Sequence, residues 1–535
     1  MTIRNPILRG FNPDPSIVRV GEDYFVATST FEWFPGVQIH RSRDLANWRL
    51  VTRPLNRAAQ LDMRGNPDSC GVWAPDLSYA GGRFHLVYTD VKRYGRTTVG
   101  GANGASLRDF HNYWVWSDRI DGEWSDPVYL NSSGFDPALF HDDDGTTWLL
   151  NMLWDHRPER PHFAGVVAQQ MDLATGQLLG ERHRIFAGTP LGFTEGPHLY
   201  KRDGWYHLLV AEGGTGWNHA VVMARSRSVL GPYEVHPDGA VLTSADKPHA
   251  PLARAGHGDI VETASGETWM VYLCGRPLAA SNRCVLGRET AIQRMQWGED
   301  GWLRTEDGSG TPVATVDAAA DSETAPTSER HAFDAGRLPD VFQWLRTPHP
   351  EHLFNLAERP GHLRLFGREM IGSAFNQALV ARRQQAFRYT AETSLEAEPA
   401  NFQQGAGLIC YYNSSKFHFL QLTAGDNGER QLQVMSAIPR EGECGLVVEA
   451  AAIPPGPLAL RVEVDHELAR FAYRVEGSAD WRWLPGTFDA SLLSDEVTLP
   501  GLPNFTGAFV GMACYDLSGA AMPADFAYFA YREFE

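Results

Sequence analysis

The sequence predicts an all-β protein in which a five-bladed β-propeller is followed by a β-sandwich. Three observations support this prediction: short runs of β-branched and aromatic residues separated by Gly, Asp and Asn turns, a motif that occurs five times with a period near 60 residues, and a change of pattern after about residue 310. The 535 residues exceed one ordinary core, since a domain typically holds roughly 100–200 residues. We therefore expect at least two domains.

The repeat lies in the first 310 residues. Each copy has a polar residue beside small or proline residues, then a strand, a polar turn and an aromatic-rich strand. The polar residues that begin the five copies are Asp14, Asp76, Asp136, Glu195 and His257, at spacings of 62, 60, 59 and 62 residues. Propellers are built by radial repetition of four-stranded sheets around a channel, so we predict one blade per copy. Equivalent positions of successive blades lie at equal radius and height, and these five side chains are therefore expected to converge on one end of the channel.

The domain boundary is expected between about residues 308 and 330, where Ala, Ser, Thr and Asp predominate without an amphipathic period. We assign residues 1–310 to the propeller, 311–330 to a linker and 331–535 to the second domain. In the second domain, strand-like stretches such as KFHFLQLT and RFAYRVEG alternate with a period of two and lack the 60-residue repeat. Two sheets packed face to face, as in a jelly-roll sandwich, are the most economical arrangement.

The charge of the chain excludes some partners. Lys and Arg number 47 against 65 Asp and Glu, a net charge of −18, and the isoelectric point is near 5.5. A phosphate backbone or an anionic membrane would be repelled by this charge. We therefore expect neither nucleic acid nor a membrane as a partner.

The N-terminal segment and the cysteines bear on the compartment. No apolar run resembles a signal-peptide core, and nowhere do about 18 consecutive apolar residues occur. The six cysteines lack a CxxC pair or regular spacing, which indicates neither a disulfide framework nor a zinc cluster. These features predict a cytoplasmic protein with reduced, mostly buried cysteines.

Three carboxylates, Asp14, Asp136 and Glu195, occupy matching places in the first, third and fourth copies of the repeat. Like charges crowded in a channel raise one another's pKa, which supplies one carboxylate base and one acid that stays protonated near neutral pH. Glycoside hydrolysis needs such a pair. Asp-Pro and Glu-Gly are also common turn dipeptides, but three in phase favour a catalytic site. Of 16 Trp residues, 13 precede residue 310, and such aromatic surfaces suit sugar binding.

Five ordered motifs, FNPDPS, VWAPDL, GFDPALF, FTEGPHLY and AGHGDIVE, together resemble glycoside hydrolase family 43, in particular its two-domain β-xylosidases. The resemblance covers essentially the whole chain. It implies that Asp14 is the general base that activates water, that Glu195 is the general acid, and that Asp136 tunes the acid and orients the sugar. It also implies inversion of the anomeric configuration, for which carboxyl groups about 6.5–9.5 Å apart leave room for a water.

Six residues are assigned to substrate binding: Phe31, Trp73, Trp154, His257, Arg288 and Phe505. The Trp73 indole is suited to stack on the apolar face of a pyranose, with a buried core Trp as the alternative. Family likeness makes Phe31 and Trp154 walls of the sugar pocket, with simple packing as the alternative. The Arg288 guanidinium is suited to bond sugar hydroxyls and steady a carboxylate, with a surface ion pair as the alternative.

His257 has two further interpretations. In the related propellers the corresponding histidine faces the channel and approaches a bound calcium. A neutral imidazole is a poor ligand for this oxygen-preferring ion, so a Ca²⁺ site in the propeller channel and a structural histidine both stay open. No cofactor is expected to be required, and no residue is assigned as a direct metal ligand.

A loop of the second domain is expected to complete the pocket. In the xylosidases that the chain resembles, such a loop brings a phenylalanine to the sugar site, and LPNFTGAFVGM is the matching segment. Phe505 is the better candidate, and Phe509, within a strand, is the alternative. A pocket closed in this way admits one terminal sugar, which implies exo-hydrolysis of short chains.

The resemblance therefore implies an exo-1,4-β-xylosidase that removes D-xylose from the non-reducing ends of xylo-oligosaccharides. The alternative is α-L-arabinofuranosidase activity, alone or as a second activity of the same site. Fructan-hydrolysing propellers are disfavoured because they typically place Cys after the acid Glu, where this chain has Gly196 and Pro197. A non-catalytic sugar-binding propeller is disfavoured because all three carboxylates are present. The resembled enzymes associate as dimers or tetramers, so a homo-oligomer is expected.

Overall fold

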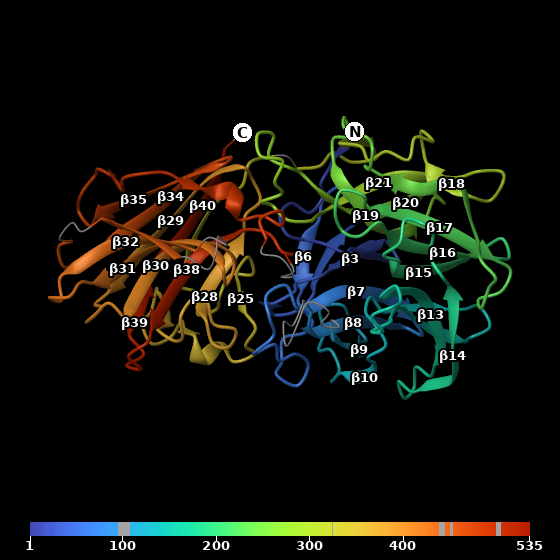
Figure 1. Cartoon of the computed structure of the whole chain (residues 1–535), viewed down its shortest axis with the longest axis horizontal. Helices are drawn as coiled ribbons and strands as arrows, with labels where there is room; N and C mark the ends of the chain where they lie inside the picture. The colour runs from blue at the N-terminus through green and yellow to red at the C-terminus, as the bar shows by residue number, and fades with distance from the viewer. Residues whose placement is uncertain (95–106, 324, 438–443, 450–452, 499–503, 535) are drawn as a thin grey trace.

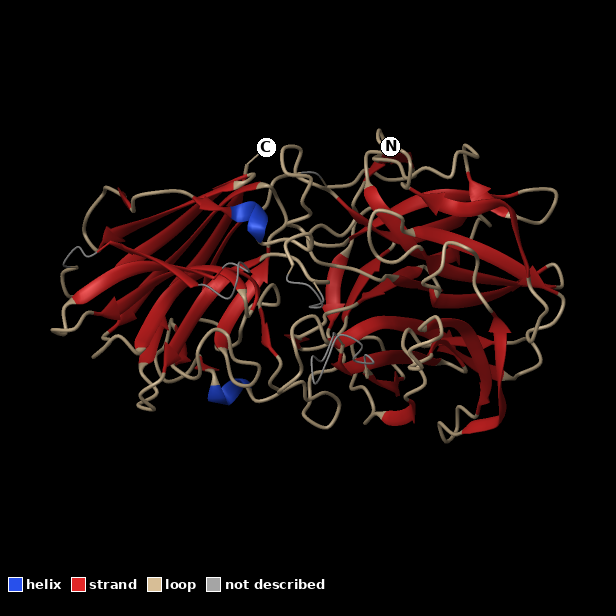
Figure 2. Cartoon of the chain, viewed as in Figure 1, coloured by secondary structure: helices blue, strands red, loops and turns tan. Residues whose placement is uncertain are grey.

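The computed structural model describes the chain except for residues 95–106, 324, 438–443, 450–452, 499–503 and 535. The described residues form strands and two short 3₁₀ helices, Pro350–His352 and Ala490–Leu492, so the predicted all-β class is confirmed. No helix in this part of the chain is long and apolar enough to cross a membrane. Figure 2 shows two lobes made almost wholly of strands.

The N-terminal lobe is a five-bladed propeller, as predicted (Figure 1). Each blade is a four-stranded antiparallel sheet whose first strand contacts the first strands of its neighbours around the channel. The blades are β2 (Ser16–Val20), β3 (Asp23–Thr28), β5 (Gln38–Ser42), β6 (Arg49–Thr52); β7 (Gly71–Ala80), β8 (Arg83–Arg93), β9 (Asp109–Ser117), β10 (Val128–Asn131); β11 (Ala138–His141), β12 (Thr147–Trp154), β13 (Phe163–Met171), β14 (Leu178–Phe186); β15 (Glu195–Arg202), β16 (Trp205–Glu212), β17 (Ala220–Ser226), β18 (Glu234–Thr243); and β19 (Ala253–Glu262), β20 (Thr268–Gly275), β21 (Glu289–Trp297), β22 (Leu303–Thr305).

The segment between the lobes contains ordered strands. β23 (Thr315–Asp317) pairs with the N-terminal β1 (Thr2–Arg4), with Ile3 opposite Val316. β24 (Ser328–Ala332) pairs with β40 (Tyr528–Glu533) at the end of the chain. The first part of residues 311–330 is thus attached to the propeller and the last part to the sandwich, while residue 324 lies outside the described residues.

The C-terminal lobe consists of two antiparallel sheets that pack face to face. One contains β24, β26 (Phe354–Asn355), β27 (Leu363–Phe366), β29 (Arg388–Ala397), β34 (Leu458–Asp465), β35 (Leu468–Val475), β36 (Arg482–Trp483), β37 (Phe488–Asp489), β39 (Pro523–Phe526) and β40. The other contains β25 (Gln343–Leu345), β28 (Ala378–Arg383), β30 (Gln404–Asn413), β31 (Lys416–Ala424), β32 (Arg430–Ala437), β33 (Cys444–Glu449) and β38 (Phe509–Asp516). The predicted period of two is visible in β29 and β34, where buried and partly exposed residues alternate.

The second sheet of the sandwich continues into the propeller chain. The short strand β4 (Trp33–Phe34), which lies between β3 and β5 of the first blade, pairs with β25. The Trp33 ring also stacks on the Phe509 ring, with centroids 3.7 Å apart. The two lobes therefore share a sheet edge and part of an aromatic core.

The start of every blade has an unusual backbone conformation. A residue with a positive φ recurs at an equivalent place near the start of each blade: Asp14 (53°), Ala74 (22°), Asp136 (54°), Gly196 (55°) and His257 (46°). In the second, fourth and fifth blades this residue interrupts the pairing register with the next strand, as a β-bulge does. Ala74 and Gly196 are therefore the structural equivalents of Asp14, Asp136 and His257. The prediction placed Asp76 and Glu195 at these positions, and it is wrong by two residues in the second blade and by one residue in the fourth.

A second layer of the channel lies two residues further along each first strand, at Ser16, Asp76, Ala138, His198 and Asp259. Some of these side chains bond the next blade. The N–H of Leu77 donates to Ser16 Oγ at 3.0 Å, and that of Leu139 donates to Asp76 Oδ2 at 2.9 Å. The N–H of Ile17 donates to Asp259 Oδ2 at 2.7 Å, which connects the fifth blade to the first. This layer joins neighbouring blades beneath the site.

Candidate active site

A cavity of about 200 Å³ lies at the end of the channel where the positive-φ residues gather. Residues from all five blades and one residue from the sandwich line it. They are Asp14, Phe31, Trp73, Tyr94, Phe135, Asp136, Phe163, Phe193, Glu195, Gly214, Thr215, His257, Arg288 and Phe505. The cavity thus brings together the three predicted catalytic carboxylates and five of the six predicted substrate-binding residues.

The Asp14 carboxylate accepts hydrogen bonds from two side chains. Its Oδ1 lies 2.7 Å from Arg288 Nη1, and its Oδ2 accepts the Ser29 hydroxyl at 2.7 Å. The Asp14 side chain is buried, so the guanidinium and the hydroxyl replace the water that would otherwise solvate the carboxylate. These bonds fix the orientation of the carboxylate, as a general base requires.

Asp136 and Glu195 are electrostatically linked. Burial raises the pKa of Glu195 to about 8, and the Asp14 charge adds to the rise. Burial and the charges of Glu195 and Asp14 likewise raise the pKa of Asp136. The Gly196 N–H donates to Asp136 Oδ2 at 3.0 Å and stabilises the ionised carboxylate. The pKa values of the two carboxyls are therefore coupled, and both lie above their ordinary range.

His257 lies against both Asp14 and Gly196, the residue that follows Glu195. Its Nδ1 is 3.8 Å from Asp14 Oδ1, and its ring packs so closely on Gly196 that a Cβ there would lie 2.8 Å from Nε2. This contact, together with the positive φ, explains why glycine follows Glu195. Burial lowers the pKa of His257 to about 4, so the imidazole is neutral in the cavity.

Arg288 connects the propeller to the sandwich loop. Besides Asp14, it bonds Thr215 Oγ1 at 3.2 Å and the Phe505 carbonyl oxygen at 3.0 Å. Its position contradicts the surface ion-pair alternative, since the residue is only 4% exposed. The Phe505 N–H in turn donates to Ser69 Oγ at 3.0 Å.

Aromatic rings form the wall of the cavity. Trp73 lies 5.6 Å from Phe31 and 5.5 Å from Phe505, measured between ring centroids, and its Nε1 donates to the Ser69 carbonyl at 3.0 Å. Of the two phenylalanines considered in the sandwich segment, Phe505 lines the cavity and Phe509 is buried against Trp33. Residues 502 and 503 of that segment lie outside the described residues.

Trp154 is not among the lining residues of the described cavity. It packs behind Phe163, with ring centroids 5.6 Å apart, and stacks on His162 at 4.9 Å. The prediction that Trp154 lines the sugar pocket is therefore wrong. The wall residue is Phe163, which lies on the next strand in front of Trp154. Trp154 and Phe163 lie opposite each other on β12 and β13. To predict which of the two rings lines the cavity, the register of this hairpin must be known.

The other lining residues that the sequence analysis missed are Tyr94, Phe135, Phe193, Gly214 and Thr215. Two of them carry a local signal, because Phe135 directly precedes Asp136 and Phe193 lies two residues before Glu195. Tyr94 and Thr215 lie in connections between strands, where the 60-residue repeat gives no positional information.

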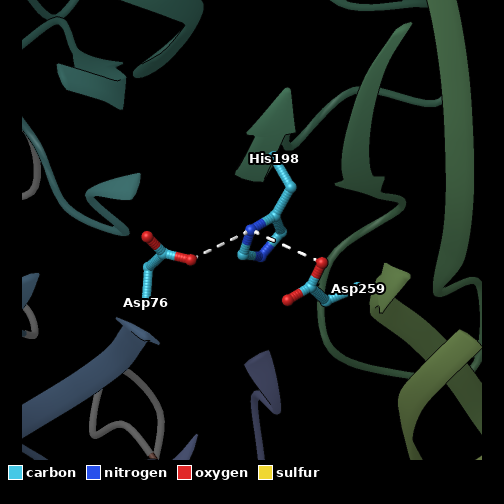
Figure 3. Close-up of side chains that lie close together, drawn as sticks. All are labelled: Asp76, His198 and Asp259. Atoms are coloured by element: carbon cyan, nitrogen blue, oxygen red, sulfur yellow. Dashed lines mark ion pairs between the residues drawn. The ribbon is translucent and has the colours of Figure 1, made fainter. Parts of the chain in front are cut away.

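The channel layer beneath the cavity holds a possible cation site (Figure 3). Asp76, His198 and Asp259 offer atoms within 4.8 Å of one another, and His257 is not part of this group. His198 Nδ1 lies 3.4 Å from Asp76 and 4.0 Å from Asp259. Burial alone would lower the pKa of His198, but the two carboxylates raise it to about 9. One of the three donors is an imidazole, which is a poor ligand for Ca²⁺, so this set fits a histidine held between two carboxylates better than it fits this oxygen-preferring ion.

A carboxylate held by an arginine, a buried carboxyl with a raised pKa and an aromatic wall in one propeller cavity are features typical of a glycoside hydrolase. The model of glycosyl hydrolases family 43 matches residues 3–303, and that of the beta xylosidase C-terminal concanavalin A-like domain matches residues 330–532. The chain belongs to glycosyl hydrolases family 43.

Similar proteins span the whole chain. It is 53% identical to the "Xylosidase/arabinosidase 43B" of Humicola insolens, over 99% of this chain and 97% of that protein. It is 46% identical to a beta-xylosidase of Bacillus subtilis (strain 168), with both chains fully covered. Among solved structures, the xylan beta-1,4-xylosidase from Bacillus halodurans C-125 superposes with a TM-score of 0.93 at 48% identity, over 99% of this chain and 100% of that one.

Proposed function

We propose that this protein is an exo-1,4-β-xylosidase that releases D-xylose from the non-reducing ends of xylo-oligosaccharides with inversion. The observation that carries the proposal is a cavity closed by Phe505 and lined by both Asp14, which Arg288 binds, and Glu195, whose pKa is raised to about 8. The names of the similar proteins from Bacillus subtilis and Bacillus halodurans support the choice of xylose.

In the proposed reaction, the Asp14 carboxylate takes a proton from a water molecule as the water oxygen bonds to the anomeric carbon. The Glu195 carboxyl gives its proton to the glycosidic oxygen as the bond between that oxygen and the anomeric carbon breaks. Asp136 keeps Glu195 protonated, and its own orientation is fixed by the Gly196 N–H. A single displacement of this kind gives α-xylose from a β-linked substrate.

The pocket favours one terminal sugar. Phe505, Trp73 and Phe31 enclose the same cavity, and the Phe505 backbone is bonded at both its N–H and its carbonyl. An internal xylan segment would have to leave the cavity in two directions. We therefore propose an exo mode of action.

The test is hydrolysis of xylobiose beside an aryl α-L-arabinofuranoside, with NMR of the first sugar released. We expect faster release from xylobiose and initial accumulation of α-xylose. Initial β-xylose would overturn inversion, and rapid shortening of long xylan from internal bonds would overturn the exo mode.

Arabinofuranosidase activity is proposed as a second activity of the same cavity, supported by the name of the Humicola insolens relative. Preferential hydrolysis of the arabinofuranoside in the same assay would reverse the order of the two activities.

We further propose that hydrolysis needs no metal ion, since the reacting groups are Asp14 and Glu195 and the channel donor set suits a protonated histidine. Loss of activity after treatment with EDTA, restored by Ca²⁺, would contradict this.

A cytoplasmic location is also proposed, supported by five buried free cysteines, Cys70, Cys274, Cys284, Cys410 and Cys514; the Cys444 side chain lies outside the described residues. A homo-oligomer is proposed from the family resemblance, and sedimentation at micromolar concentration tests it.

A further inference from the structure

A second cavity, of about 180 Å³, lies between the first blade and the sandwich. Three arginines line it: Arg53, which follows β6, and Arg382 and Arg383, which end β28. The carboxylate in its lining is that of Asp340, which is exposed and pairs with Arg337 at 3.1 Å. In a chain of net charge −18, this is a local concentration of positive charge.

Arg383 has unused hydrogen-bonding capacity. It is 7% exposed, and its Nε and Nη1 donate to the Phe11 carbonyl and to Gln343 Oε1, both at 2.6 Å. Its Nη2 is buried and has no hydrogen-bond partner among the described residues. Within the same part of the chain, no carboxylate lies within ion-pair distance of Arg383, so its charge is not compensated.

The Arg53 guanidinium also bonds only a neutral side chain among the described residues. Its Nε and Nη2 donate to the neutral Gln38 Oε1, at 3.0 and 2.6 Å, and the described residues provide it with no ion pair. His40 lines the same cavity, and its buried Nδ1 has no partner in the described structure. Arg382 differs, because Glu329 pairs with it at 3.1 Å.

The electrostatics agree with this geometry. Burial lowers the pKa of Arg53 to about 10 although the Asp340 charge opposes this fall, and burial together with the Arg53 charge lowers the pKa of Arg383. Burying a charge without a counter-charge is costly, and two like charges on one cavity add to the cost. A bound anion removes both penalties at once.

We propose that this cavity binds a small oxyanion of the phosphate type, held between Arg53 and Arg383. Guanidinium groups bond such anions through pairs of N–H groups, and Arg383 Nη2 and His40 Nδ1 are available as additional contacts. The volume is also sufficient, since a water molecule takes about 30 Å³ in the liquid and the cavity is several times larger.

The oxyanion would join the two lobes. Arg53 belongs to the propeller and Arg383 to the sandwich, so an anion between them bridges the interface. Arg383 also bonds the Phe11 carbonyl, and the Phe11 ring lies 5.5 Å from Phe31 of the active-site wall. We therefore expect occupancy to stabilise the interface, because a ligand that binds only the folded state raises its stability.

The test uses inorganic phosphate and the full chain. Thermal unfolding and titration calorimetry are measured with increasing phosphate, while NaCl keeps the ionic strength constant. We expect a saturable rise in Tm and a binding isotherm in the wild-type protein. Arg53→Gln should weaken binding at least tenfold. Arg43→Gln, a matched change at an arginine whose side chain is 67% exposed, should leave it unchanged.

The proposal fails if phosphate gives no saturable effect, if Arg53→Gln binds as the wild type does, or if chloride stabilises equally at the same concentration. Should Arg53→Gln fail to fold, selenate-soaked wild-type crystals decide the question: an anomalous peak between Arg53 and Arg383 supports the site, and an empty cavity overturns it. Xylobiose hydrolysis by Arg53→Gln is measured separately, so a failed glycosidase assignment is distinguishable from a failed anion site.

Discussion

The Arg288 guanidinium donates to the carbonyl oxygen of Phe505 at 3.0 Å and, through its other terminal nitrogen, to Asp14 at 2.7 Å. One side chain thus positions both the proposed base, which belongs to the propeller, and the loop that closes the sugar pocket, which belongs to the sandwich. The active site is therefore a property of the two lobes together.

Phe505→Ala should weaken substrate binding more than it slows the chemical step. The ring contacts Phe31, Trp73 and Tyr94 and closes one side of the cavity, but it carries no proton. Loss of an aromatic contact of this kind is worth about 1.4 kcal/mol, so we expect KM for xylobiose to rise about tenfold. Phe402→Ala, at a ring that is 68% exposed, is the control, and an unchanged KM for Phe505→Ala would remove Phe505 from the sugar site.

Glu195→Ala should impair substrates in proportion to how poor their leaving group is. General acid assistance is typically worth about 10²–10⁴-fold, and it matters least when the departing group leaves readily. We expect a loss in this range for xylobiose and a much smaller loss for a dinitrophenyl xyloside. Asp14→Ala should damage both substrates alike, because both need an activated water. Near-normal hydrolysis of xylobiose by Glu195→Ala would show that the acid has been misassigned.

Asp136→Asn should shift the pH profile as well as lower the rate. Asp136 and Glu195 are electrostatically coupled, so the charge of an ionised Asp136 opposes ionisation of Glu195 and its removal should lower the pKa of Glu195. The alkaline limb of kcat/KM for xylobiose should then move to lower pH, measured from pH 4 to 9. An unchanged limb would leave Asp136 with a sugar-binding role only, and a shift to higher pH would make Asp136 the proton donor.

His198 should make the stability of the propeller depend on pH. Its pKa is about 9 in the folded protein, above the ordinary value of 6.5, so its ion pairs stabilise the fold fully below pH 6.5. This contribution is lost as the pH rises through 9. We expect Tm to fall between pH 7 and 9.5 in the wild type, and to fall less in His198→Asn. The exposed His156 provides the matched control, since His156→Asn should preserve the wild-type slope.

Arg254→Met should destabilise the contact between the lobes. The buried Arg254 guanidinium pairs with Asp495 and Glu496 of the sandwich, each at 3.0 Å. Removing it leaves the Asp495 carboxylate buried beside Glu496, and breaking a buried pair typically costs about 3–5 kcal/mol. A clear fall in Tm by calorimetry is expected, whereas Arg119→Met, at an exposed pair with Asp121, should change Tm little. Equal Tm values for the two variants would contradict the role of Arg254.

The sequence was sufficient to predict the five blades, because the strand and turn pattern recurs with a fixed period. It was not sufficient to predict the exact equivalences. Ala74 and Gly196 occupy the positions that Asp14 has in the first blade, and neither has a polar side chain that marks the position. Glu195 lies one residue before this position and still lines the cavity, because the β-bulge changes the direction of the backbone there.

The wrong prediction of Trp154 in place of Phe163 as a wall residue also arose because the sequence does not show the local backbone geometry. Both residues are aromatic and both lie near a blade end, so composition does not distinguish the ring in front from the ring behind. The contribution of β4 to the sandwich was also missed, because two residues are too few to show a period of two.

The pairing of Trp33–Phe34 with β25 has a consequence for dissecting the chain. A fragment that begins after the propeller would lose the terminal strand of its eight-stranded sheet and expose the backbone edge of β25. A fragment that ends before the sandwich would leave the Trp33 indole, now fully buried against Phe509, open to water. Exposed edges and aromatic patches promote association. Neither half is thus a self-sufficient module, and exchange of the C-terminal half between homologous enzymes requires that residues 33–34 be exchanged with it.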